Sequence, residues 1–495
     1  MAWTASWRRP RALLALVAAL HGLSPLLVLG PHYWFGVDET IYLSQINGYA
    51  PPNFFSAPRS RGVTFLAAPV TLLTDSTVAI RVWLAVLSAI ALYLAFRPWL
   101  HVLAGRTAVL AALLFSTIWV VIYYAFEVMP NYWSAAAVVA ATGYALRFLR
   151  EGRRWQLVAV GVAMGLVALI RPSDAMYGGV VLAACALFVS AAMRRRLGVV
   201  AAIAVGSAAG AADWVVEAFT SYGGLGQRIH QAQAENGGPG VHFAGAAQWR
   251  TLAGPVLCRN GCRANASFLY QWWWLALIVL VAVGLGYARR ERDLTVHRFS
   301  SVSVPTVVGL AMAAQYVFEV TYSAPRFLTP TYALLALPAA SGAVHLVKAT
   351  SPGVPRFALA GGMVLVLALN AGIEVNVITA NLKPNSVRSS TALLADADYL
   401  NGAGVDGPCI LLGTGRMDVA RLAYATGCTD RPAGGPALRE RMEDGTRVLW
   451  LGAGRVRYPG VHWQQLHLPV HTSSLPRLAW LSTSQPTGPD SDTRA

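Results

Sequence analysis

Charged residues are scarce in this sequence, and their scarcity sets the class of the protein. Only 13% of its 495 residues are Asp, Glu, Lys or Arg, whereas 55% are hydrophobic. Average soluble domains carry roughly 25% charged residues. So few charges cannot coat a large soluble particle, but they suit a helical bundle whose solvent is lipid. The composition therefore excludes a soluble globular domain and predicts an integral membrane protein.

Acidic residues are the scarcer of the two signs, with 23 Asp and Glu against 39 Lys and Arg, which gives a net charge of +16. A basic balance can indicate a nucleic-acid partner, but these basic residues stand in short clusters between apolar runs. Such clusters report membrane orientation and contact with anionic headgroups. We therefore expect the lipid bilayer as a partner, and no nucleic acid.

The apolar runs predict about eleven transmembrane helices of roughly 20 residues each. The expected spans lie near residues 11–30, 78–96, 107–126, 130–148, 155–170, 176–193, 198–218, 268–288, 302–320, 327–347 and 357–375. The apolar stretch from Val63 to Leu73 is too short to span, so we expect it to lie in the interface or to be re-entrant.

The basic clusters predict the orientation independently of the span count. With the N-terminus in the cytoplasm, every short cluster falls in a cytoplasmic connection. The clusters are Arg8, Arg9 and Arg11; Arg97 and Arg106; Arg147, Arg150, Arg153 and Arg154; Arg194, Arg195 and Arg196; Arg289, Arg290, Arg292 and Arg298; and Lys348 and Arg356. The alternation requires an odd number of spans, which predicts a multi-pass plasma-membrane protein with its C-terminus outside the cytoplasm.

Five cysteines fit this topology. Cys185 lies inside the sixth span. Cys258 and Cys262 lie in the outer segment 219–267, and Cys409 and Cys428 lie near the C-terminus. Both pairs face the side where disulfides persist, which predicts the bridges Cys258–Cys262 and Cys409–Cys428. A zinc site at Cys258 and Cys262 is the alternative, but two further ligands are lacking nearby.

The sequence predicts a transmembrane module at 1–376 and a smaller outer domain at 377–481, followed by a disordered tail at 482–495. Within the module, the outer connections 31–77 and 219–267 are long. In the smaller domain, apolar runs shorten, and the composition predicts an α/β fold with strands and a helix. The expected elements are a strand at 408–412, a helix at 418–425 and a strand at 447–451.

The first outer connection carries an acidic pair among aromatic residues, Asp38 and Glu39. Carboxylates at a membrane edge are costly, and they indicate a functional site by default. A structural alternative is that Asp38 caps a helix beginning at Thr40. Glu39 would then be a first-turn acid that the helix dipole favours.

This connection resembles the first extracytoplasmic loop of GT-C glycosyltransferases, in the branch of protein O-mannosyltransferases and lipid A aminoarabinose transferases. That branch has an Asp-Glu pair after the first helix, then a Tyr and a basic segment with Pro. The resemblance extends over about residues 10–345. It includes Arg81 at the second span, Arg171-Pro172-Ser173-Asp174 after the fifth, and Arg326-Phe327-Leu328 before a late span. At Glu127, many relatives carry Asp.

The resemblance implies an all-α polytopic fold and a polyprenyl-phosphate sugar as donor, with an acceptor outside the cytoplasm. It implies no certain cofactor and allows a divalent metal, which Glu39 could bind. Asp38 is the expected general base, with Glu39 and Glu127 as further catalytic candidates. The expected substrate-binding residues are Tyr42, Arg59, Arg61, Arg171, Asp174 and Arg326, with the arginines on the phosphate. One base without a covalent intermediate implies inversion by a hexosyl- or pentosyltransferase.

Purely structural roles for these residues, and two other functions, remain open. Interfacial arginines commonly snorkel to headgroups, Glu127 could end a span, and Asp174 could cap the sixth span. A transporter or flippase of lipid-linked sugars is the main alternative function, and the lack of an internal repeat weakens it. A non-catalytic envelope assembly protein would not need the acidic pair.

The predicted topology has a direct test. A cysteine introduced near Ser482 should react with a membrane-impermeant thiol reagent in intact cells, because an odd number of spans puts this residue outside. A cysteine introduced near Arg194 should react only after lysis. Protection of the Ser482 position until lysis would contradict the orientation.

Overall fold

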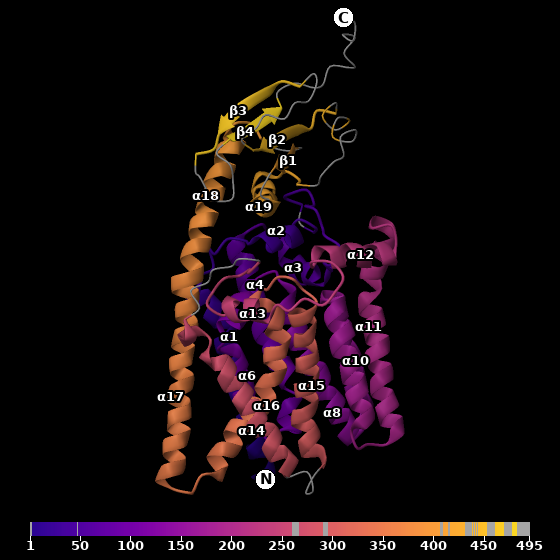
Figure 1. The fold of residues 1–495 in the computed structure, drawn as a ribbon, viewed down its shortest axis with the longest axis vertical. Coiled ribbons are helices and arrows are strands. Elements are labelled where there is room, and N and C mark those ends of the chain that lie inside the picture. The colour runs from indigo at the N-terminus through magenta and orange to yellow at the C-terminus, as the bar shows by residue number, and fades with distance from the viewer. Residues whose placement is uncertain are drawn as a thin grey trace, which may run out of the picture. The chain divides into compact units, whose positions relative to one another are not determined.

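In this computed structural model, the chain divides into two compact units (Figure 1). The structure describes residues 2–46, 48–259, 267–290, 296–405, 409–413, 416–430, 438, 440, 442, 444–452, 461–469 and 478–482. The first of the two compact units, which we call the helical unit, comprises Met1–Pro31, Ala57–Val63 and Arg81–Lys383. We call the second the loop-sheet unit; it comprises His32–Ser56, Thr64–Ile80 and Pro384–Ala495.

Helices form at all eleven predicted spans, the third span being covered by the pair α6 and α7. The α-helices other than α2, α3, α18 and α19, which are described below, are α1 Ala2–Val28, α4 Thr77–Phe96, α5 Trp99–Val102, α6 Gly105–Ser116, α7 Trp119–Tyr124, α8 Pro130–Glu151, α9 Arg154–Ile170, α10 Pro172–Phe188, α11 Met193–Ser221, α12 Leu225–Glu235, α13 Gly245–Thr251, α14 Trp272–Arg290, α15 Val296–Phe318, α16 Thr329–Ala349 and α17 Val354–Asn376. Shorter helical turns are η1 Phe268–Tyr270, η2 Pro325–Leu328 and η3 Val377–Leu382.

Seven helical segments of the described residues are long and apolar enough to cross a membrane. They are Arg9–Val28, Thr77–Val102, Met193–Ser221, Trp272–Arg290, Arg298–Phe318, Pro325–Ala349 and Val354–Gly402. Helices α6, α9 and α10 are apolar but shorter. The prediction of a polytopic helical membrane protein is confirmed, although length and composition alone qualify seven spans rather than eleven.

Helix α8 has the length of a span but carries polar residues such as Asn131, Ser134 and Arg147. Its side chains are buried along nearly the whole helix, because α5, α9, α10, α11, α15 and α16 pack around it. A helix that neighbouring helices cover needs no apolar face toward lipid. Polar residues are therefore tolerated here, and hydropathy underrates this helix.

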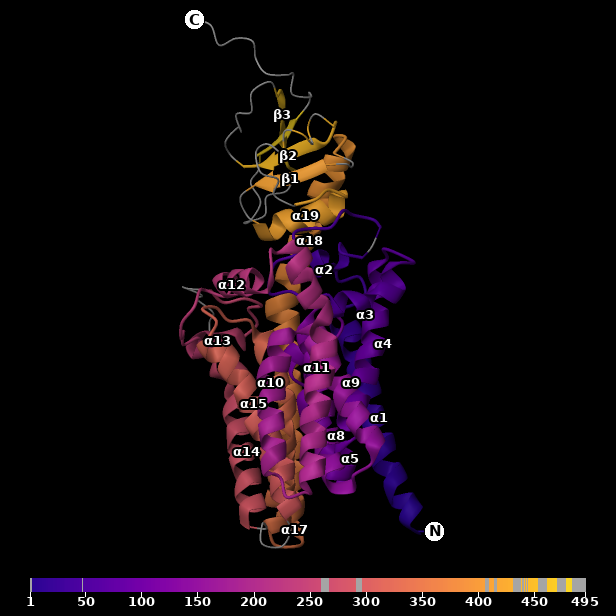
Figure 2. The ribbon, with the colours of Figure 1, turned by 90° about the vertical axis from the view of Figure 1, so that its right-hand side faces the viewer.

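Glycines let α9 and α11 approach closely, and Figure 2 shows these helices side by side. A Cβ atom at Gly206 would overlap the carbonyl oxygen of Gly161, and one at Gly210 would overlap that of Gly165. Each helix thus presents two glycines four residues apart, the small-residue spacing that promotes close helix packing in membranes.

Connections that were predicted to be cytoplasmic come together in the helical unit. The Arg195 guanidinium donates to the backbone oxygens of Leu149 and Arg150, and the Arg150 guanidinium donates to that of Val102. Three connections thus meet at one end of the helices, as the predicted alternation requires. Which membrane side this end faces stays a prediction.

The loop-sheet unit contains a four-stranded sheet in the order β1-β2-β4-β3 (Figure 1). Strand β1 pairs in parallel with β2, and β4 pairs antiparallel with both β2 and β3. Helix α19 connects β1 to β2. The bounds are β1 Cys409–Gly413, β2 Arg447–Leu451, β3 Trp463–His467, β4 Leu478–Ser482, α18 Lys383–Gly402 and α19 Arg416–Thr426. The two predicted strands, the predicted helix and the small α/β fold are confirmed.

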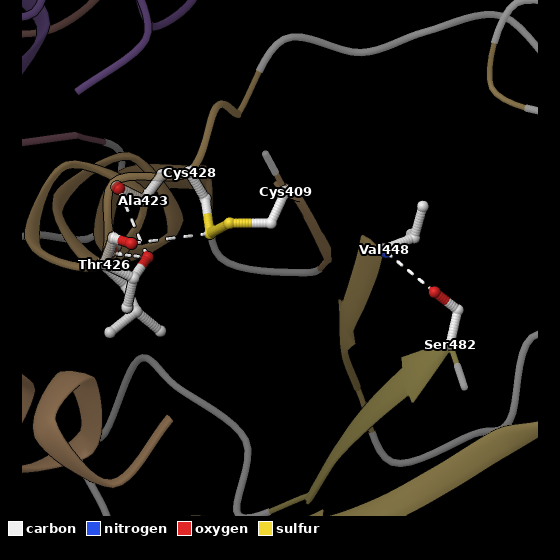
Figure 3. The surroundings of a disulfide bond; sticks show 7 residues. Cys409, Ala423, Thr426, Cys428, Val448 and Ser482 are labelled. Carbon is white, nitrogen blue, oxygen red and sulfur yellow. Dashed lines mark hydrogen bonds between the residues drawn. A yellow bond between two sulfur atoms is a disulfide. The ribbon is translucent and has the colours of Figure 1, made fainter. Parts of the chain in front are cut away.

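A disulfide joins Cys409 at the start of β1 to Cys428 just after α19 (Figure 3). The two Cα atoms are 4.7 Å apart, and 19 positions separate the cysteines in sequence. Closing a loop of this length is worth about 3 kcal/mol in the chain-entropy model. This predicted bridge is confirmed, whereas Cys262 of the other predicted pair lies outside the described residues.

Most of the predicted outer connection 31–77 belongs to the loop-sheet unit. It forms α2 at Val37–Leu43, and α3 at Gly62–Thr71 begins at its boundary with the helical unit. The stretch predicted to be too short to span is indeed a ten-residue helix. Nothing in the sequence indicates that this N-terminal connection and the C-terminal sheet form one compact unit. Beyond Ser482, the predicted disordered tail lies outside the described residues.

The glycine contacts predict a stability effect. Gly206→Ala should force α9 and α11 apart, because its Cβ has no room beside Gly161. A lower thermal unfolding midpoint in detergent, and lower expression, are the expected results. Gly286→Ala on α14 is the matched control, since nothing lies within 4 Å of that Cβ position. Equal midpoints for both variants would contradict the close packing.

Candidate functional site

The acidic pair lies in the first turn of α2, within the loop-sheet unit. Gly36 is the N-cap of this helix, and its backbone N–H donates to Glu39 Oε2 at 2.8 Å. Glu39 is only 1% exposed, whereas Asp38 is half-buried. The structural alternative for Asp38 is therefore wrong, since the helix begins before it and Glu39 satisfies the cap position. Glu39 orients the helix start, and Asp38 is the more accessible carboxylate.

Tyr42 occupies the next turn of α2 and is buried. Its ring packs edge-on against Phe55, with 5.8 Å between the ring centroids. Its carbonyl oxygen accepts a hydrogen bond from the Thr64 hydroxyl at 3.4 Å. Both contacts indicate a packing role, and a substrate contact for Tyr42 stays a prediction.

In the helical unit, Arg61 forms an ion pair with Glu217 on α11. The Arg61 Nη2 atom lies 2.6 Å from Glu217 Oε1, and Arg61 Nε lies 3.0 Å from the same oxygen. Glu217 also accepts from Arg228 at 2.9 Å. Arg61 thus shares a carboxylate with a second arginine, which ties its segment to α11.

Arg228 on α12 is fully buried and holds the segment that contains Arg59. Its guanidinium donates to the backbone oxygens of Ala57 and Arg59 and to that of Trp214. The rings of Trp214 and Tyr222 lie 4.4 and 4.2 Å from its guanidinium carbon. Burial lowers the pKa of Arg228, and the Glu217 carboxylate acts in the opposite direction.

The segment that contains Arg59 also packs against the C-terminal end of α9. The Ser60 hydroxyl donates to the Leu169 carbonyl at 2.6 Å, and a Cβ atom on Gly62 would lie 2.7 Å from Ile170 Cα. Arg171 follows Ile170 directly and is extended, as expected for a residue before proline. The structure therefore brings the segment that carries Arg59 and Arg61 to the helix end that carries Arg171.

Asp174 is a buried carboxylate that fixes Arg171. It accepts hydrogen bonds from the Ser134 and Tyr316 hydroxyls, and its Oδ1 atom lies 3.5 Å from Arg171 Nε. The N-cap of α10 is Arg171, so Asp174 lies in the first turn of that helix and not at its cap. With no exposed surface, Asp174 is better placed to position Arg171 than to contact a substrate.

Arg171 and Arg326 share an aromatic platform. The Arg171 guanidinium lies over Tyr316 and Phe327, at 5.2 and 5.8 Å from the ring centroids. Arg326 lies over Phe327 and Tyr124, at 5.4 and 5.8 Å. Two arginines far apart in sequence thus share the Phe327 ring, which stacks on Tyr316 with 4.9 Å between the ring centroids; we call Arg171 and Arg326 the arginine cluster.

Glu127 is buried between α7 and α8, beside a buried arginine on α4. The Arg81 guanidinium donates to the carbonyl oxygen of Phe126, the preceding residue, at 2.8 Å. It also lies 4.7 Å from the centroid of the Phe126 ring. Arg81 thereby fixes the backbone that carries Glu127.

An apolar groove lies between α9, α10 and α11 and has a volume of about 390 Å³. Its lining is apolar apart from Ser207, and it lies at the surface because Met176 and Val180 are exposed. The lining residues are Ala168, Pro172, Ala175, Met176, Gly179, Val180, Ala183, Val200, Ile203, Ala204, Ser207, Ala208 and Ala211. Ala168 and Pro172 stand close to Arg171 in sequence, whereas no arginine side chain of the described residues lines the groove.

Nothing in the sequence indicated a role for Arg228, and Arg81 was indicated only through the family resemblance. Their partners lie far away in sequence, so no local spacing could have indicated them. Among the described residues, no group of three or more His, Cys, Asp or Glu side chains could hold a metal ion. A divalent metal therefore has no preassembled set of such ligands there.

Comparison with known structures identifies the fold of the chain. No family model and no curated protein matches the sequence. Apo ArnT from Cupriavidus metallidurans matches with a TM-score of 0.62 at 12% identity, over 96% of this chain and 98% of that one. ArnT bound to undecaprenyl phosphate matches with 0.58 at 12% identity over the same shares. The chain has the GT-C fold.

A second GT-C structure agrees. The oligosaccharyltransferase AglB from Archaeoglobus fulgidus, in complex with an inhibitory peptide and a dolichol-phosphate, matches with a TM-score of 0.51 at 12% identity, over 89% of this chain and 69% of that one. In the form tethered with an acceptor peptide, this chain spans only 63% of the length of the oligosaccharyltransferase. The predicted GT-C fold is confirmed. At such low sequence identity, the structural similarity shows the fold and not the activity.

The shared carboxylate of Arg61 and Arg228 predicts a stability effect. Glu217→Gln should destabilise the protein by about 3 kcal/mol, because removing one partner leaves a buried charge uncompensated. Thermal unfolding in detergent measures the effect. Glu235→Gln, at an exposed position of α12, is the control and should leave the midpoint unchanged. A midpoint of Glu217→Gln equal to that of the control would show that the ion pair contributes nothing.

Proposed function

We propose that the protein is a membrane glycosyltransferase that moves a sugar from a polyprenyl-phosphate donor to an acceptor outside the cytoplasm. The observation that carries the proposal is the pair Arg171 and Arg326, which both lie over the Phe327 ring, together with an apolar groove whose lining includes Pro172, the residue after Arg171. A ligand with a long apolar chain and an anionic head matches this combination. The GT-C fold, shared with ArnT bound to undecaprenyl phosphate, supports the same donor class.

The phosphate is the leaving group in this reaction. The acceptor forms a bond to the anomeric carbon, the bond from that carbon to the phosphate oxygen breaks, and the electron pair leaves with the polyprenyl phosphate. Arg171 and Arg326 stabilise the charge on the phosphate by charge-assisted hydrogen bonds. Asp174 restrains the Arg171 guanidinium, and the Phe327 ring lies beside both guanidiniums. Arg59 and Arg61 add positive charge beside the same helix end.

Asp38 is the proposed general base. Its carboxylate takes the proton of the acceptor as the new bond forms, which makes the acceptor a better nucleophile. Glu39 is held by the backbone of Gly36, so it orients α2 and is not itself the base. Glu127 is a second candidate carboxylate in the helical unit. One displacement with one base inverts the configuration at the anomeric carbon.

The general base can be tested by one isosteric change. Asp38→Asn should lower turnover by about two to four orders of magnitude, the usual scale for general acid–base catalysis. Folding and donor binding should survive, because the side chain keeps its size and loses only a negative charge. The measurement is label transfer from a synthetic polyprenyl-phosphate sugar to isolated cell-envelope acceptor, run beside a donor-binding measurement.

Three further variants make this test selective. Asp75→Asn, at an exposed position before α4, should turn over as fast as the wild type. Glu39→Gln should cost less than Asp38→Asn. Arg326→Ala should instead weaken donor binding by about tenfold or more, the value of a hydrogen bond to a charged group. Turnover by Asp38→Asn equal to that of the wild type would contradict the assignment of Asp38 as the base. A wild-type protein that binds no polyprenyl phosphate would contradict the proposed function.

A further inference from the structure

We propose that Arg421, in the C-terminal part of the chain, is a positioning residue that fixes the start of α2 and thereby the carboxylate of Asp38. The inference rests on the proposed function, in which Asp38 is the base. It gives the small α/β part of the protein a role in transfer, although 383 positions separate Arg421 from Asp38. All contacts that carry it lie inside the loop-sheet unit.

One peptide group connects Arg421 to the acidic pair. The Arg421 Nε atom donates to the carbonyl oxygen of Phe35 at 3.2 Å, and the N–H of Gly36 donates to Glu39 Oε2 at 2.8 Å. This carbonyl and this N–H belong to the same planar peptide bond. The peptide that opens α2 is therefore held from both sides, by Glu39 within the helix and by Arg421 from α19.

The other donors of Arg421 anchor it to α18 and α19. Its Nη1 atom donates to the Ser389 hydroxyl at 3.1 Å and approaches Asp418 Oδ1 at 3.5 Å, and its Nη2 atom donates to the Ser390 hydroxyl at 2.8 Å. Its guanidinium carbon lies 5.2 Å from the centroid of the Trp34 ring. Only a planar guanidinium with several donors can serve these partners at once.

The far end of α2 is also attached to α19. The Asn53 side chain donates to the Ala420 carbonyl at 2.9 Å, and the Asn53 backbone N–H donates to the Ser44 hydroxyl, just after α2, at 3.0 Å. Phe35 adds an edge-on ring contact with Tyr424. Figure 1 shows α19 between the sheet and α2. Helix α19 thus contacts both ends of the segment that carries Asp38.

The disulfide fixes α19 in turn. Cys409 begins β1 and Cys428 follows α19, so the bridge ties the C-terminal end of this helix to the sheet (Figure 3). A rigid α19 is what an arginine on it needs in order to hold α2. Small misplacement of a catalytic group matters, since a shift of about 1 Å can cost about a hundredfold in rate.

Arg421→Met and Arg421→Lys test the proposal in the full-length protein. Methionine keeps the length but removes every donor, so kcat should fall by about a hundredfold while donor Kd stays constant. Lysine keeps the charge and one strong donor, so its kcat should lie between those of methionine and wild type. Arg388→Met is the matched control, because Arg388 is exposed on α18 and, within the described part of the chain, donates to Pro384 and Asn385 of its own helix.

Amide hydrogen exchange gives a readout that does not depend on activity. Arg421→Met should speed exchange in residues 37–44, with the strands β1 and β2 as internal reference. Unchanged exchange in α2 would overturn the positioning role, and so would an equal increase in the sheet, which would indicate general destabilisation. If the wild type transfers no sugar while α2 exchange still responds, the proposed function fails and the attachment of α2 to Arg421 stands.

The double variant Asp38→Asn with Arg421→Met decides whether Arg421 acts through Asp38. Residues that work as a unit show non-additive effects. The double variant should therefore turn over no more slowly than Asp38→Asn alone. A further hundredfold loss in the double variant would show that Arg421 acts by another route and would overturn the proposal.

Discussion

A charged side chain that leaves water needs partners, and three buried arginines organise this chain by meeting that need. Arg81, Arg228 and Arg421 all donate to backbone carbonyl oxygens of irregular segments. A guanidinium suits this task because its donors lie in a fixed plane and its faces stack on aromatic rings. Each held carbonyl lies at or near a candidate site residue, namely Phe126 before Glu127, Arg59 itself, and Phe35 before the pair Asp38 and Glu39.

In the proposed reaction, the two compact units supply different groups. The helical unit combines an apolar groove with an arginine cluster at Arg171, which suits an amphiphilic anion. The loop-sheet unit presents Asp38 on a short helix whose first peptide is fixed. Binding a lipid phosphate requires cations and apolar surface, whereas proton abstraction requires a restrained carboxylate. The fold therefore supports each demand with a different part of the chain.

Several carboxylates that look similar in sequence have different environments. Asp174 is enclosed by Ser134, Tyr316 and Arg171, and Glu39 accepts from a backbone N–H, so both act on their neighbours. Asp38 is half-buried. Asp38 is therefore the most accessible of these three carboxylates, which favours it as the proposed base.

The sequence by itself determined the membrane class, the helix positions, the Cys409–Cys428 bridge and the GT-C resemblance, because composition, apolar run length and short motifs are local properties. It also located the acidic pair. Only the tertiary structure decided that Glu39 serves the helix start and that Arg61 pairs with Glu217, 156 positions away. The same holds for Arg421 and Phe35, which 386 positions separate. Such contacts arise when distant segments pack and bury a charge, and burial of that kind leaves no periodic trace along the chain.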